Sequence, residues 1–245
     1  MLFDLLQKHT FFKKHTLLHI TPVSNQGLCN TNYKLQTNKA DYLIRVFGPT
    51  DAIDIDRKLE FNIALKAYKI GIGAKPLTLD KSNNIMICHY LDGYHKFKLK
   101  KIDIKNIAKL IKKLHSIKID QTPFDIKKAL PNNFRLTKFK QEHVLCHHDL
   151  NPKNFIFSHD IKLIDWEYAR KNDRYFDLAT IIIEFNLNKN DEKTLLTSYM
   201  RNYSKVDMKK MLLFKKIYLT LCIKWSKQTN NQKEKIRYIK KLLRL

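Results

Sequence analysis

All five glycines of this 245-residue chain lie within its first 93 residues, at positions 27, 48, 71, 73 and 93. Glycine permits the tight turns that join short strands. The region after residue 93 has no glycine, and its apolar residues recur every three or four positions, which is typical of helices. The distribution predicts an α+β protein with a small, mainly β part over residues 1–91 and a larger helical part over residues 92–245.

The first part contains short runs that are rich in β-branched and aromatic residues. These runs predict strands over residues 17–23, 32–36, 42–47 and 85–91, with a hairpin turn at 37–41. Between the third and fourth strand, apolar residues at helical spacing predict a helix over residues 54–70 that ends at Gly71.

The second part is expected to be mainly helical, with apolar faces over residues 107–114 and 211–225. Its exception is a hairpin, because the apolar runs 155–157 and 161–164 flank a polar turn at 158–160.

The net charge of +24, from 47 basic and 23 acidic residues, suggests a nucleic acid or an anionic membrane as partner. However, only 8 of the basic residues are arginine, and the lysines are spread along the whole chain. This pattern favours a generally basic surface, and no specific nucleic-acid partner is expected. A non-catalytic protein that binds polyanions stays open as an alternative of another class.

Location and oxidation state follow from what the chain lacks. The four cysteines are far apart and form no pair at metal-binding spacing, so reduced thiols are expected. The apolar runs are much shorter than the ~20 residues of a spanning helix, and the first residues do not resemble a secretory signal. We therefore expect a cytoplasmic protein without a membrane span.

Three polar residues surround the predicted hairpin. Asn154 precedes its first strand, Asp165 follows its second, and Asp149 lies five residues before Asn154. The two ends of an antiparallel pair lie at the same edge, so these oxygen-bearing side chains should converge. Carboxylate and amide oxygens suit Mg²⁺ that also holds substrate phosphates. The sequence thus predicts a phosphoryl-transfer site.

The same order of residues occurs in the catalytic loop and metal-binding Asp of kinases. The segments Ile164-Asp-Trp-Glu-Tyr-Ala169 and Asn172-Asp-Arg-Tyr-Phe-Asp-Leu-Ala179 resemble the choline kinase and aminoglycoside phosphotransferase superfamily, and within it the bacterial LicA-type choline kinases. Weaker matches lie at residues 26–33, 42–48 and 56–60. The resemblance implies a two-lobed protein-kinase-like fold that uses ATP and Mg²⁺.

Roles follow from the resemblance residue by residue. Asp149 would orient or deprotonate the acceptor hydroxyl, and Asn154 and Asp165 would hold Mg²⁺, with Glu167 as a further metal contact. His147 would brace this loop, and Asp177 would accept hydrogen bonds from its backbone. His115 is expected to be structural. The nucleotide-binding residues implied are Gly27, Asn30, Arg45, Glu60, Cys88, Tyr90 and Leu91, with Arg45 paired to Glu60 and the last three forming a hinge against adenine.

The acceptor is expected to be a small cationic alcohol, held by aromatic faces and a carboxylate. The candidates are Tyr168, Glu184 and Trp225. Trp225 matches the second tryptophan of a W-x-x-W-S pattern of the family, while Cys222 replaces the first. The implied reaction is phosphorylation of choline to phosphocholine by ATP. Thiamine, ethanolamine and aminoglycosides are alternative acceptors, and the oligomeric state is left open.

Overall fold

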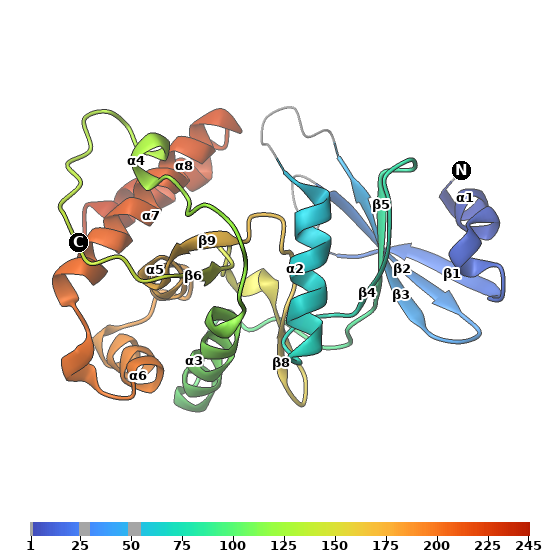
Figure 1. Ribbon diagram of the computed structural model, residues 1–245, viewed down its shortest axis with the longest axis horizontal. Coiled ribbons are helices and arrows are strands. Elements are labelled where there is room, and N and C mark those ends of the chain that lie inside the picture. The colour runs from blue at the N-terminus through green and yellow to red at the C-terminus, as the bar shows by residue number, and fades with distance from the viewer. Residues whose placement is uncertain (1, 25–29, 49–54) are drawn as a thin grey trace. The chain divides into compact units, whose positions relative to one another are not determined.

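The computed structural model describes residues 2–24, 30–48 and 55–245 (Figure 1). It divides into two compact units. The first comprises Met1–Tyr94 and Lys162–Glu167, and the second comprises His95–Ile161 and Tyr168–Leu245. The short segment 162–167, which begins within the second arm of the predicted hairpin, therefore belongs to the first unit. It brings Asp165 and Glu167 to the β part of the molecule.

The first unit is built on a five-stranded antiparallel sheet in the order β1-β2-β3-β5-β4. Its elements are α1 (Leu2–Lys8), a 3₁₀ turn (Thr10–Phe12), β1 (Leu17–Pro22), β2 (Asn30–Thr37), β3 (Asp41–Phe47), α2 (Arg57–Lys69), β4 (Pro76–Asp80) and β5 (Ile85–His89).

The two faces of strand β3 have different environments. Tyr42 and Ile44 are buried in an apolar cluster with α1 and the 3₁₀ turn. Arg45 follows Ile44, so it belongs to the opposite face of the sheet, where α2 supplies its ion-pair partner Glu60. Strand alternation therefore places the buried guanidinium of Arg45 between β3 and α2, where other polar side chains can gather around it.

The second unit is mainly helical. Its helices are α3 (Lys101–Ser116), α4 (Ile126–Ala129), α5 (Arg174–Glu184), α6 (Lys189–Met200), α7 (Met208–Gln228) and α8 (Gln232–Leu242), with 3₁₀ turns at Pro152–Asn154 and Tyr203–Lys205. The short strands are β6 (His143–Cys146), β7 (Phe155–Phe157), β8 (Ile161–Leu163), which reaches into the first unit, and β9 (Arg170–Asp173).

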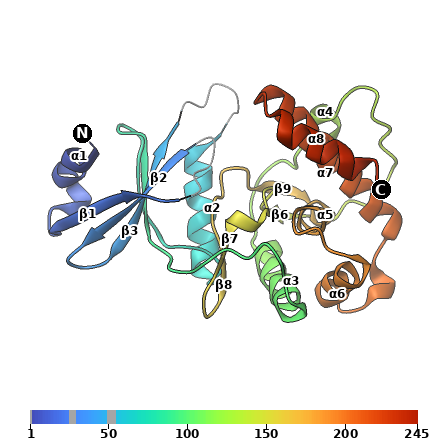
Figure 2. The same ribbon diagram turned by 180° about the vertical axis from the view of Figure 1, so that it is seen from behind.

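Helix α5 forms the centre of this unit, because all of its residues after Arg174 are buried. It packs against α7, and α3 packs against α6, as seen from behind in Figure 2. None of the helices in the described residues is both long and apolar enough to cross a lipid bilayer.

The predicted strands, the first helix and both arms of the hairpin are confirmed, with ends shifted by a few residues. The sequence analysis missed α1, β4, β6 and β9. Strand β9 has the sequence Arg-Lys-Asn-Asp and carries no apolar signal. It is extended because it pairs with β6, with Asp173 opposite His143 and Arg170 opposite Cys146.

Candidate active site

The loop that follows β6 is held in place by a buried carboxylate of α5. Asp177 is fully buried and accepts hydrogen bonds from the backbone N–H of His147 (2.8 Å) and of His148 (3.0 Å). Burial alone would raise the pKa of Asp177, but the hydrogen bonds it accepts from His115 and the loop lower that pKa below its usual range. The expected role of Asp177 is confirmed.

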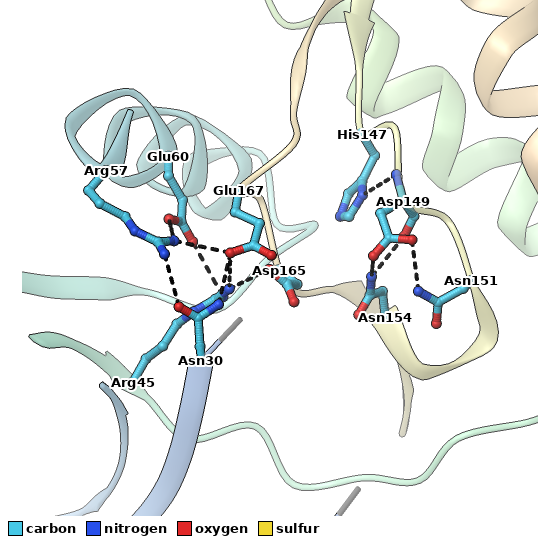
Figure 3. Close-up of polar contacts among 10 residues, drawn as sticks. All are labelled: Asn30, Arg45, Arg57, Glu60, His147, Asp149, Asn151, Asn154, Asp165 and Glu167. Carbon is cyan, nitrogen blue, oxygen red and sulfur yellow. Dashed lines mark hydrogen bonds and ion pairs between the residues drawn. The ribbon is translucent and has the colours of Figure 1, made fainter. Parts of the chain in front are cut away.

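Asp149 lies at the centre of this loop and is oriented by two amides (Figure 3). The Nδ2 of Asn151 donates to Asp149 Oδ1 at 2.9 Å, and the Nδ2 of Asn154 donates to Asp149 Oδ2 at 2.8 Å. Asn154 Nδ2 also donates to the carbonyl of Asp149, and the N–H of Asp149 lies 3.4 Å from His147 Nδ1. Since the amide nitrogen of Asn154 is used in this way, its oxygen is the atom that can bind a cation.

His148 fixes the shape of the loop. Its φ of 69° is in the left-handed region, which is uncommon for a residue with a side chain. The imidazole stacks on Phe176 with centroids 4.4 Å apart and lies 3.1 Å from the amide of Asn172. Burial lowers the pKa of His148 to about 3, so the ring is neutral and structural.

The first unit contains a buried ion cluster around Arg45 (Figure 3). One Nη of Arg45 lies 3.3 Å from Glu60 Oε1, and the other lies 2.5 Å from Asp165 Oδ1 and 3.1 Å from Glu167 Oε2. The predicted pair of Arg45 and Glu60 is present. Opposite charges around the buried guanidinium outweigh the effect of burial and raise its pKa.

Arg57 completes the cluster and was missed by the sequence analysis. It donates to Glu60 (2.8 Å), to Glu167 (3.1 Å) and to the side-chain oxygen of Asn30 (3.0 Å), and its guanidinium lies 4.1 Å from the ring centre of Phe47. The i,i+3 spacing of Arg57 and Glu60 on the predicted helix was the available signal. Asn30, expected to cover phosphates, also donates to Glu167 at 2.8 Å.

The cluster has three carboxylates, Glu60, Asp165 and Glu167, against two guanidinium groups, which leaves one negative charge in excess. Asp165 is the most exposed of the three, with 29% of its side chain accessible, and its φ of 68° is again in the left-handed region. Such conformations are concentrated at functional sites. An excess carboxylate with accessible oxygens fits a divalent cation such as Mg²⁺.

The remaining predicted nucleotide residues lie at or after the end of β5. Cys88 is buried, and burial raises the pKa of its thiol to about 12. Tyr90 and Leu91 are half-buried, and the N–H of Tyr90 donates to the carbonyl of Asp41. Gly27 lies outside the described residues.

The candidate acceptor residues have different surroundings. Glu184 is buried, and its two oxygens accept hydrogen bonds from the hydroxyl of Tyr218 (2.9 Å) and from Arg237 (2.7 Å). Arg237 lies on α8, 53 residues further along the chain, and was not foreseen. Trp225 on α7 and Tyr168 are half-buried. The Glu184 carboxylate is thus already paired with a cation of the protein.

The Glu184 group lies within electrostatic range of the loop that carries Asp149. Burial is the main cause of the raised pKa values of Tyr218 and Cys222, and the negative charges of Glu184 and Asp149 raise both further. Asp149 and these α7 side chains therefore belong to one region of the second unit.

His115, Cys146 and Asp177 form a buried group whose potential ligand atoms lie within 4.8 Å of one another. All three are engaged in hydrogen bonds: His115 with Tyr199 and Asp177, and the thiol of Cys146 with backbone carbonyls of Asn172 and Asp173. Burial also raises the pKa of Cys146 well above its usual value, so the thiol keeps its proton. The group is structural, as expected for His115.

Comparison with solved structures identifies the fold. The chain shares its fold with the crystal structure of the choline kinase LicA from Streptococcus pneumoniae, at 21% identity and a TM-score of 0.80 over 100% of both chains. It also matches a LicA structure in complex with AMP, at 20% identity and a TM-score of 0.73, over 98% of this chain and 97% of that one. The chain therefore has the kinase-like fold of these two LicA structures.

Sequence comparison identifies related proteins. The choline/ethanolamine kinase family profile matches residues 127–244. Protein LicA of Haemophilus influenzae is 25% identical over 221 residues, which are 76% of this chain and 65% of that protein. The chain is thus similar to the choline/ethanolamine kinase family, whose profile covers slightly less than half of its length, and it spans slightly less than two thirds of this curated relative.

Proposed function

We propose that the protein transfers the γ-phosphoryl group of ATP to the hydroxyl of choline, which yields phosphocholine and ADP. The observation that carries the proposal is the fixed position of Asp149, whose carboxylate accepts hydrogen bonds from Asn151 and Asn154 on a loop anchored by Asp177. A carboxylate that is oriented in this way suits an acceptor hydroxyl, whose oxygen must be aligned with phosphorus and must lose a proton.

Asp149 receives the proton of the acceptor hydroxyl while the new O–P bond forms and the bond from the γ-phosphorus to the β,γ-bridging oxygen breaks. The bond electrons leave with ADP, so the step needs no further reactant. Because the transition state is loose, most of the rate enhancement comes from positioning and from neutralisation of phosphate charge.

Mg²⁺ is the metal that the oxygen ligands favour. The proposed ligands are the accessible carboxylate of Asp165, Glu167 beside it in the same cluster, and the amide oxygen of Asn154. When bound, the ion neutralises charge on the phosphate oxygens.

Arg45 is proposed to contact the ATP phosphates. Its guanidinium is held from one side by Glu60 at 3.3 Å, and its other nitrogen is bonded to Asp165. A cation on Asp165 would compete for that carboxylate, and one N–H of Arg45 would then be available for phosphate, while Glu60 keeps the side chain in place. Gly27, Asn30, Cys88, Tyr90 and Leu91 remain proposed nucleotide-binding residues.

The acceptor is proposed to lie near Glu184, Trp225 and Tyr168. Choline carries a quaternary ammonium that cannot donate hydrogen bonds, so aromatic faces and a negative field must hold it. Tyr218 and Tyr238 add aromatic rings around Glu184, with their centroids 6.5 Å apart. The family name includes ethanolamine, which differs from choline by having N–H donors. Thiamine and aminoglycosides remain alternative acceptors.

The test is release of ADP by the purified chain with ATP and Mg²⁺, measured in parallel with choline, ethanolamine, thiamine and kanamycin. We expect turnover to be fastest with choline. Faster turnover with another acceptor would replace choline in the proposal, and absence of turnover with all four would overturn the proposed reaction. The polyanion-binding alternative instead predicts salt-sensitive binding that is unchanged in Asp149→Asn.

A further inference from the structure

A hollow of about 440 Å³ lies in the second unit, and its lining includes none of the residues assigned above to ATP, metal and acceptor. Its lining comes from the end of α3, the end of α6, the start of α5, the 3₁₀ turn after α6 and the start of β6. Four cationic side chains contribute to it, against one carboxylate among the described lining residues. The cations are Lys112, Arg174, Arg201 and Lys205, and the carboxylate is Glu142.

The overall positive charge of the chain does not by itself explain this arrangement. A cation near a helix C-terminus commonly binds the last carbonyl groups, and Lys112 does so by donating to the carbonyl of Ser198 at 2.9 Å. In the described part of the chain, by contrast, the side chains of Arg201 and Lys205 have neither a hydrogen bond nor an ion pair. These two side chains therefore make no polar contact with any residue that the structure describes.

Glu142 does not compensate the excess charge. Its Oε1 lies 3.5 Å from Arg174 Nε, and its Oε2 lies 2.9 Å from the ammonium of Lys210, which is buried. The one carboxylate of the hollow is therefore divided between two cations. Burial lowers the pKa of Lys112, and the charge of Arg201 lowers it further, as expected where like charges are held together.

We propose that this hollow is a binding site for a small phosphate-bearing anion. Arginine presents a planar fork of N–H donors that matches phosphate oxygens, and lysine adds a compact positive charge. The volume lies within the usual range for small-molecule sites. With Glu142 already paired, the excess of positive charge suits a ligand with two or more negative charges.

The site borders the residues that support the catalytic loop. Its lining includes Tyr199 and His115. The Tyr199 hydroxyl lies 2.7 Å from His115 Nδ1, and His115 Nε2 lies 3.2 Å from Asp177 Oδ2, the acceptor of the loop N–H groups. The proposed ligand site shares none of its lining residues with the proposed catalytic site, so this inference does not rest on the proposed function.

The test is isothermal titration of the full chain with inorganic phosphate, pyrophosphate and phosphocholine in separate experiments. Arg201→Gln/Lys205→Gln removes two charges from the hollow. The matched control is Lys105→Gln/Lys216→Gln, which removes two exposed charges from α3 and α7 outside the hollow. Neither pair of side chains has a structural partner in the described residues, so both variants should fold, and circular dichroism checks this.

We expect at least one of the three anions to bind the wild type and the control equally, and the Arg201→Gln/Lys205→Gln variant at least about tenfold more weakly. The same anion should raise the melting temperature of the wild type more than that of this variant. The anion that binds most tightly shows which kind of phosphate compound the hollow accepts. Absence of binding to the wild type, or equal affinity in both double variants, would overturn the proposal.

Discussion

Asp177→Asn tests how the catalytic loop is held. The carboxylate accepts the N–H groups of His147 and His148, and it also contacts His115. Asparagine is nearly the same size, but it replaces one acceptor oxygen with an NH₂ group that cannot accept from a backbone N–H. A hydrogen bond to a charged group contributes about 1.5–3 kcal/mol, and a buried N–H left without a partner costs about 1–3 kcal/mol. We expect the free energy of unfolding to fall by about 2–4 kcal/mol.

The measurement is thermal unfolding together with ADP release at saturating ATP and choline. For a chain of this length, the expected loss of stability lowers the melting temperature by roughly 5–15 °C. The turnover number should change by a larger factor than the KM for ATP, because the loop carries Asp149. Asp120→Asn is the matched control, since Asp120 is exposed and makes no contact of this kind in the described structure. An unchanged melting temperature in Asp177→Asn would refute the reasoning.

The pH dependence of stability gives a second measure of the same carboxylate. Because the pKa of Asp177 is lower in the folded chain than in the unfolded one, its contribution is complete above the unfolded pKa and is lost as pH falls through the folded value. Between neutral pH and the acid range, wild-type stability should therefore decline more than that of Asp177→Asn. Parallel pH profiles would contradict this sign.

Three further outcomes follow from the structure. Arg45→Lys should lower kcat/KM for ATP by about 10- to 100-fold, because an ammonium cannot replace the fork that contacts several carboxylates; unchanged ATP kinetics would contradict this role. Glu184→Gln should lower the melting temperature and raise the KM for choline more than that for ATP, since it removes a buried charge that pairs with Arg237 and leaves Arg237 only its more exposed partner Glu234; equal effects on both KM values would argue against a role in the acceptor site. Cys88 and Cys146 should resist iodoacetamide at pH 8 in the folded chain, because burial raises both thiol pKa values, and peptide mass spectrometry showing rapid modification of either would contradict the burial.

The sequence was sufficient where local pattern and chain order determine the result. Residue pattern predicted strand β3 and helix α2. The pair of Arg45 with Glu60 followed from the resemblance to a known family, and the structure shows this pair. The role of Asp177 followed from its place in a segment that resembles a known family, and its hydrogen bonds to the loop N–H groups are present.

The sequence was insufficient where a residue's partner lies far along the chain. Arg57 at the start of a helix could equally face solvent, and its contact with Glu167, 110 residues away, depends on how the chain folds back. Arg237 reaches Glu184 across 53 residues in the same way. Strand β9 lacks apolar residues and is defined by pairing with β6 alone. These features depend on tertiary contacts, which override the local conformational preferences of the residues.

The central claim is that Asp149 serves phosphoryl transfer to choline, and one measurement tests it most directly. ADP release that depends on added choline should be readily detected for the wild type and should fall by at least about 100-fold in Asp149→Asn, with ATP binding retained, because asparagine can orient a hydroxyl but cannot take its proton. Choline-dependent ADP release by Asp149→Asn at the wild-type rate would contradict the account.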